Sequence, residues 1–184
     1  LIRSYPNNIK VFIDYAHTPD ALFTTLNSLI NNYGNNISLV FGCGGERDQT
    51  KRPLMAKIAN NICNKIYITD DNPRNENPAK IRHELLKHIH KNKVFNIGKR
   101  ALAIRKAILN AEDRETILIA GKGHEEHQLY KNKIIYISDK KIIKELKIKF
   151  RALNKNTDVM GDLKVQIAML GKTLEALENR IERT

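Results

Sequence analysis

Short apolar runs alternate with longer segments of helical periodicity over the first 150 residues of the chain. The runs are β-branched and almost continuously apolar, which is typical of strands that are buried on both faces. They predict strands at Lys10–Asp14, Ile37–Gly42, Lys65–Thr69, Lys93–Ile97, Thr116–Gly121 and Ile134–Ser138. The periodic segments predict helices at Pro19–Asn32, Arg52–Asn64, Pro78–Lys91, Lys99–Ala111 and Asp139–Lys149.

This alternation predicts an α/β, Rossmann-like fold with a mostly parallel six-stranded sheet, right-handed crossovers and flanking helices. Pro19 and Pro78 suit the first turn of a helix, because the missing amide hydrogen needs no partner there. Asn77 suits the cap that precedes Pro78. Ligands of such sheets bind at the carboxyl ends of the strands, so a functional site is expected there.

Polar and glycine-rich loops follow four of the predicted strands, at residues 14–17, 42–48, 70–74 and 121–125. Taken singly, each loop is equally well explained as a tight turn. Together they place a group of ionisable side chains on one rim: Asp14, His17, Arg47, Asp71, Arg74, His124 and Glu125. Such a concentration of charge is costly in a core and useful in a site.

Both signs of charge occur on this rim. Arg47 and Arg74 can each bind a carboxylate through two parallel hydrogen bonds, whereas Asp71 and Glu125 can bind an ammonium group. The rim therefore suits a zwitterion such as an amino acid better than a bare phosphate. Asp14, which stands apart at the first strand, can bond a ribose hydroxyl.

Several chemistries are not supported. The loop GCGGERD lacks the GK[ST] ending of a phosphate-binding loop, and GKGHE lacks a Ser or Thr that would hold magnesium. His17 with Cys43 forms the only weak candidate for a nucleophile–base pair. Cys43 and Cys63 lack metal-site spacing and are expected to be reduced thiols of a cytoplasmic protein. No metal site is predicted.

Five motifs, in this order, resemble the C-terminal domain of the Mur ligases over about residues 9–149: Asp14–Leu22, Phe41–Asp48, Lys51–Met55, Thr69–Arg74 and Ala120–Glu125. They are most similar to the members that add the third peptide residue to UDP-N-acetylmuramoyl-L-alanyl-D-glutamate. The resemblance implies ATP-dependent amide-bond synthesis in peptidoglycan biosynthesis. In that reaction ATP phosphorylates the D-glutamate carboxylate, and an incoming amine attacks the acyl phosphate.

Carried over by position, the resemblance implies that Asp14 and His17 contact the nucleotide. It implies that the amino acid is held by Arg47, Asp71, Asn72, Pro73, Arg74, Gly121 and Glu125. The Asp-Asn-Pro-Arg form resembles enzymes that add meso-diaminopimelate, whose second carboxylate needs a cation that lysine as substrate would not. No residue of this chain is expected to be catalytic or to ligate a metal.

The chain departs from a complete ligase of this family. It shows no UDP-binding domain, no central ATPase domain with its GxxGKT loop, and no lysine for carbamylation. We therefore expect a fragment that catalyses nothing alone, with ATP and Mg²⁺ acting in the full-length enzyme. The expected partners are meso-diaminopimelate, ATP, the UDP-MurNAc-dipeptide and the missing N-terminal and central domains. No run of about eighteen apolar residues occurs, so no membrane segment is expected.

The composition changes after residue 150, which predicts a domain at 1–150, a linker at 151–162 and an amphipathic helix at 163–184. Apolar residues recur there at 4-3-4-3-4 spacing: Leu163, Ile167, Leu170, Leu174, Leu177 and Ile181. This helix either docks on its own domain or forms a short coiled coil through which copies of the chain self-associate. An alternative function is thus a non-catalytic Rossmann-like binding module that its tail oligomerises.

The net charge of +12, from 32 basic and 20 acidic residues, raises a third class of function, nucleic-acid binding. The excess is spread as lysine over predicted helix faces and strand edges. It is not gathered with aromatic residues into a base-stacking stripe. No nucleic-acid partner is therefore expected.

Overall fold

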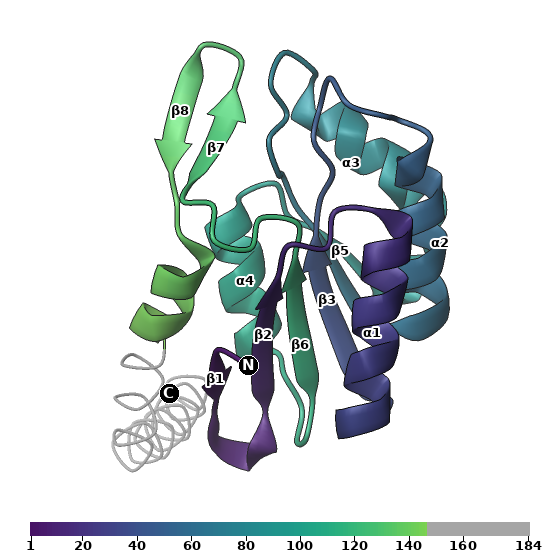
Figure 1. The fold of residues 1–184 in the computed structure, drawn as a ribbon, viewed down its shortest axis with the longest axis vertical. Helices are drawn as coiled ribbons and strands as arrows, with labels where there is room; N and C mark the ends of the chain where they lie inside the picture. The colour runs from purple at the N-terminus through teal and green to yellow at the C-terminus, as the bar shows by residue number, and fades with distance from the viewer. Residues whose placement is uncertain (147–184) are drawn as a thin grey trace, which may run out of the picture. The chain divides into compact units, whose positions relative to one another are not determined.

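The computed structural model describes residues 1–146 of the 184-residue chain. The linker predicted at 151–162 and the helix predicted at 163–184 lie outside the described residues. Residues Leu1–Glu145 form a compact unit, in which helices cover both faces of a central sheet (Figure 1).

The main sheet has six strands in the order β1-β2-β6-β3-β4-β5. The strands are β1 (Arg3–Ser4), β2 (Lys10–Asp14), β3 (Ile37–Phe41), β4 (Lys65–Ile68), β5 (Val94–Asn96) and β6 (Thr116–Ala120). All neighbours are parallel except β1 and β2. Every residue of β3 and β6 is buried, because these central strands are covered on both faces. The prediction of a mostly parallel six-stranded sheet is confirmed.

Three helices pack in succession on one face of the sheet: α1 (Pro19–Tyr33), α2 (Lys51–Ile62) and α3 (Pro78–Leu86). α4 (Arg100–Leu109) packs against β3, β4 and β6 on the opposite face (Figure 1). Residues 139–146 are also helical. Two 3₁₀ turns, η1 (Pro6–Asn8) and η2 (Lys91–Lys93), complete the elements of regular helix. No helix in this described part is long and apolar enough to cross a membrane.

Two predicted helix starts are confirmed, and α2 and α4 each begin one residue away from the predicted starts at Arg52 and Lys99. Pro19 and Pro78 stand in the first turns of α1 and α3. The side chain of Asn77 accepts a hydrogen bond of 2.9 Å from the amide of Ala79, as a cap should. The end of α3 is not as predicted: the helix stops at Leu86 instead of reaching Lys91, and η2 follows it.

The prediction that Ile134–Ser138 is a strand of the main sheet is wrong. Instead β8 (Lys133–Tyr136) pairs antiparallel with β7 (His127–Tyr130) as a separate two-stranded sheet, and β1 is the sixth strand of the main sheet. Tyr136 is 86% exposed, so this short apolar run is not buried on both faces. Periodicity cannot distinguish a hairpin strand from a central one when the run is this short.

Candidate functional site

The loops that follow β2, β3, β4 and β6 enclose a cavity of about 420 Å³. These are the loops whose polar residues predicted a site. The cavity is lined by most of the residues singled out there: His17, Arg47, Asp71, Asn72, Arg74, Gly121 and Glu125. Three residues expected at the rim or the amino-acid site do not line it: Asp14, Pro73 and His124.

The segment that follows β4 is held in place by β7. The side-chain amide of Gln128 donates to the backbone oxygens of Asp70 and Asp71, at 2.8 Å each. The amide of Arg74 donates to the carbonyl of Leu129 at 2.8 Å, and Arg74 adopts a left-handed φ of 51°. β7 therefore fixes the backbone of residues 70–74, from which Asp71, Asn72 and Arg74 reach the cavity.

Lys122, Asn72 and Glu125 form a closed triangle of hydrogen bonds. The Lys122 Nζ, on a side chain with no exposed surface, donates to Glu125 Oε2 at 2.8 Å and to Asn72 Oδ1 at 3.1 Å. The Asn72 Nδ2 donates to the same Glu125 oxygen at 3.2 Å. Burial acts to raise the pKa of the Glu125 carboxyl, but the hydrogen bond and charge of Lys122 help to bring that pKa below its ordinary value.

The two arginines of the cavity differ in their surroundings. The Arg74 NH1 donates to the carbonyl of Gly45 at 2.8 Å and lies 3.4 Å from the carbonyl of Asn72. Part of the fork that was predicted to bind a carboxylate is therefore used by the backbone. Arg47 is exposed and forms no hydrogen bond or ion pair with any other described residue. Its guanidinium is available to a ligand.

The loop after β2 holds the residues expected to contact a nucleotide. Asp14 Oδ1 accepts from the amide of Ala16 at 2.7 Å, so this oxygen faces its own loop. The His17 Nδ1 lies 2.9 Å from the carbonyl of Tyr15, while its Nε2 has no hydrogen bond within the described part of the chain. The half-exposed Tyr15 ring has its centroid 4.6 Å from that of His17 and 6.2 Å from that of His124.

Arg52, which is fully buried in α2, links the loop after β3 to α3 and to the segment that precedes α3. Its NH2 donates to the carbonyl of Gly44 at 3.2 Å and to Glu76 at 2.9 Å, and its NH1 donates to Glu84 at 2.7 Å. Sequence reasoning gave no role to this arginine, to Lys122 or to Gln128. Arg52 and Lys122 lie inside the motifs Lys51–Met55 and Ala120–Glu125, whereas no feature of the neighbouring sequence points to Gln128.

Cys43 also lines the cavity, but it is not a nucleophile at neutral pH. Its burial raises the pKa of the thiol to about 12, so the sulfur stays protonated at neutral pH. Both Cys43 and Cys63 are free thiols, as predicted. No group of three or more His, Cys, Asp or Glu residues within the described range could hold a metal ion.

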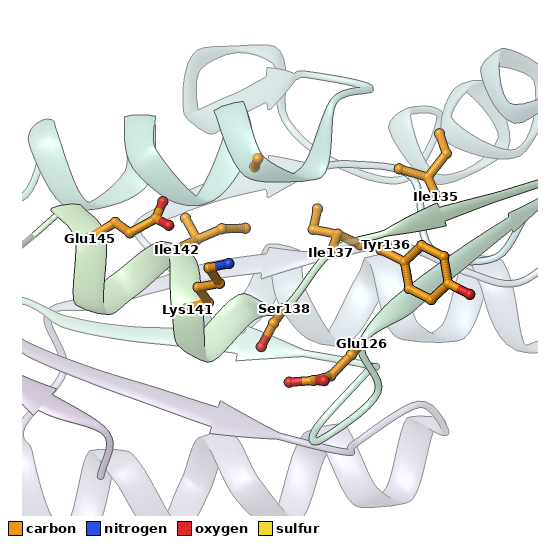
Figure 2. A pocket seen from close by; sticks show the side chains of 9 residues that line it. Glu126, Ile135, Tyr136, Ile137, Ser138, Lys141, Ile142 and Glu145 are labelled. Atoms are coloured by element: carbon orange, nitrogen blue, oxygen red, sulfur yellow. The ribbon is translucent and has the colours of Figure 1, made fainter.

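A second cavity, of about 460 Å³, lies between α4, β8 and the helical residues 139–146 (Figure 2). Its lining includes three isoleucines and three charged residues, Glu126, Lys141 and Glu145. None of the residues that the motifs single out lines it. The cavity enclosed by the loops after β2, β3, β4 and β6 is therefore the candidate site, although it is slightly smaller than this second cavity.

The profile of the family described as "Mur ligase, glutamate ligase domain" matches residues 1–123. This chain belongs to the Mur ligase family. The UDP-N-acetylmuramoyl-L-alanyl-D-glutamate–2,6-diaminopimelate ligase of Buchnera aphidicola subsp. Schizaphis graminum (strain Sg) is 51% identical over 138 residues, which cover 74% of this chain and 28% of that protein. The ligase of the same name from Clostridium botulinum (strain ATCC 19397 / Type A) is 40% identical over 144 residues, with 78% and 30% covered.

A solved structure of a ligase with this name superimposes with a TM-score of 0.72 at 35% identity. The match covers 77% of this chain and 29% of that one. The chain thus spans less than a third of the length of the relatives that it matches.

Proposed function

We propose that this chain is the amino-acid-binding domain of an ATP-dependent ligase that joins meso-diaminopimelate to UDP-N-acetylmuramoyl-L-alanyl-D-glutamate in peptidoglycan biosynthesis. The observation that carries the proposal is the combination of Arg47 and Arg74 with Asp71 and Glu125 around one cavity. Two relatives that are 40% and 51% identical are named as ligases of this kind, which supports it.

Diaminopimelate carries two carboxylates and two amino groups. In our proposal, the guanidinium groups of Arg47 and Arg74 bind carboxylates, and the carboxylates of Asp71 and Glu125 bind ammonium. A volume of about 420 Å³ suits a ligand of this size. Lysine lacks the second carboxylate, so its binding would leave one of the two guanidinium groups without a carboxylate partner.

The nucleotide contacts rest on the loop after β2. His17 fits this role, because it lines the cavity with Nε2 unbonded among the described residues. Asp14 fits less closely, since one of its oxygens is bound to the amide of Ala16. ATP would supply the phosphoryl group that activates the D-glutamate carboxyl. We assign Mg²⁺ and the UDP-linked substrate to parts of the longer ligase that lie outside residues 1–150, and self-association through residues 163–184 stays a prediction.

Binding is tested by NMR titration of the 184-residue chain with meso-diaminopimelate, since NMR detects weak complexes. L-Lysine is the matched control ligand. We expect chemical-shift changes at Asn72, Gly121 and Glu125, with lysine binding at least about tenfold more weakly. A well-folded chain that shows no diaminopimelate-dependent shifts at these residues would refute the proposal.

Activity is tested in a chimera in which residues 1–146 of this chain replace the matching segment of the Buchnera ligase. We expect ADP release that depends on meso-diaminopimelate and is about 100-fold less efficient with L-lysine. A chimera that folds and binds ATP but prefers lysine would contradict the assignment of the substrate.

A further inference from the structure

Lys122 is a buried cation that does not itself line the cavity. Its side chain has no exposed surface, and a buried ammonium group is costly unless it is hydrogen-bonded to an opposite charge. Both of its hydrogen-bond partners, Glu125 at 2.8 Å and Asn72 at 3.1 Å, do line the cavity. The cost of burying Lys122 is therefore offset by contacts to residues of the candidate site.

The hydrogen bonds of this cluster determine how each side chain is oriented. The Asn72 Oδ1 accepts from Lys122 Nζ and from the amide of Leu129 at 3.0 Å, which leaves Nδ2 to donate to Glu125. Two donors therefore converge on Glu125 Oε2. No hydrogen bond within the described residues uses Oε1, so this oxygen remains available to a ligand.

We propose that Lys122 is a positioning residue that holds Glu125 ionised and oriented, so that Glu125 Oε1 can accept a hydrogen bond from an ammonium group of the bound amino acid. The identity of that ligand rests on the proposed function. The orientation and ionisation of Glu125 do not, because they concern the unliganded chain.

The charges around Glu125 explain why Lys122 matters most. His127 lowers the pKa of Glu125 less than Lys122 does, and Arg100 interacts electrostatically with Glu125 from α4. Burial of the carboxyl opposes all of them. Without Lys122, Glu125 would take up a proton at a higher pH, and a protonated carboxyl cannot pair with an ammonium ion.

The test is a ¹³C NMR pH titration of the Glu125 carboxyl in the 184-residue chain. It compares wild type with Lys122→Met, the charge-preserving Lys122→Arg, and the exposed control Lys57→Met on α2. We expect the pKa of Glu125 to lie below the ordinary glutamate value in wild type and Lys57→Met. Lys122→Met should raise that pKa, and Lys122→Arg should restore most of the difference. Thermal melts check that each variant folds, and Lys122→Gln replaces Lys122→Met if the latter does not.

The same variants are then titrated with meso-diaminopimelate. Wild type should keep its affinity between about pH 7 and about pH 5, whereas Lys122→Met should bind about tenfold more weakly at the lower pH. Two results would overturn the proposal. One is an ordinary pKa for Glu125 in the wild-type chain, and the other is a pKa of Glu125 that does not change in a folded Lys122→Met chain. If the pKa responds as expected but wild type binds no diaminopimelate, the positioning of Glu125 stands and the proposed substrate fails.

Discussion

Replacing Gly45 by alanine tests how closely the loops after β3 and β4 must approach each other. A Cβ at this position would lie 2.0 Å from the carbonyl oxygen of Pro73 and 2.8 Å from its carbonyl carbon. Gly45 does not adopt a positive φ, so the added methyl group is opposed by contacts alone: these two and the Glu76 Cβ, which would lie 3.1 Å away. Ordinary carbon–oxygen contacts are about 3.3 Å or longer, and the two backbones would therefore have to separate by about 1 Å or more.

The cost follows from the contacts that this separation would strain. The Gly45 amide donates to the carbonyl of Asn72 at 2.9 Å, and the Gly45 carbonyl accepts from Arg74 NH1 at 2.8 Å. Overpacking typically costs about 1–3 kcal/mol, and each weakened hydrogen bond about 0.5–1.5 kcal/mol. We expect Gly45→Ala to lower the free energy of unfolding by about 2–4 kcal/mol.

Urea denaturation followed by circular dichroism measures this loss, with Gly44→Ala as the matched control. A Cβ at Gly44 would lie 3.0 Å from Arg74 NH1, the far end of a flexible side chain that can move away. The control should therefore cost less than about 1 kcal/mol. Equal destabilisation by the two substitutions, or a wild-type denaturation midpoint for Gly45→Ala, would refute this account of the contact between the loops.

Three further predictions concern other parts of the chain. In the chimeric ligase, Arg74→Ala should reduce the preference for diaminopimelate over lysine at least about tenfold, measured as the ratio of kcat/KM values, and an unchanged ratio would contradict the role of Arg74. Asp139→Ala removes the carboxylate that lies 2.7 Å from the buried Arg100 guanidinium. It should lower the free energy of unfolding by about 3–5 kcal/mol in urea, and a loss below about 1 kcal/mol would be inconsistent with the burial of this pair. Burial raises the pKa of both Cys43 and Cys63 to about 12. Both thiols should therefore stay protonated at pH 8 and react with a thiol reagent only when the chain unfolds, and rapid modification of the native chain would argue against their burial.

The local pattern of the sequence was sufficient to predict much of the fold. β2, β3, β4 and β6 lie within one residue of their predicted ends, because a continuous apolar run suits a strand that is covered on both faces. The helix starts followed from proline and cap residues, which act on their own neighbours. The carboxyl-end loops were found for the same reason, since a polar loop after a buried strand is visible in the chain itself.

Only the tertiary structure decided which distant residues meet. β8 is apolar enough to resemble a central strand, yet it pairs with β7, and nothing local encodes that choice. Lys122 reaches Asn72 across 50 positions, and Leu129 reaches Asn72 across 57. A lysine in a glycine-rich loop is read from sequence as exposed, because its burial depends on a carboxylate and an amide that only folding brings within 3.1 Å of its Nζ.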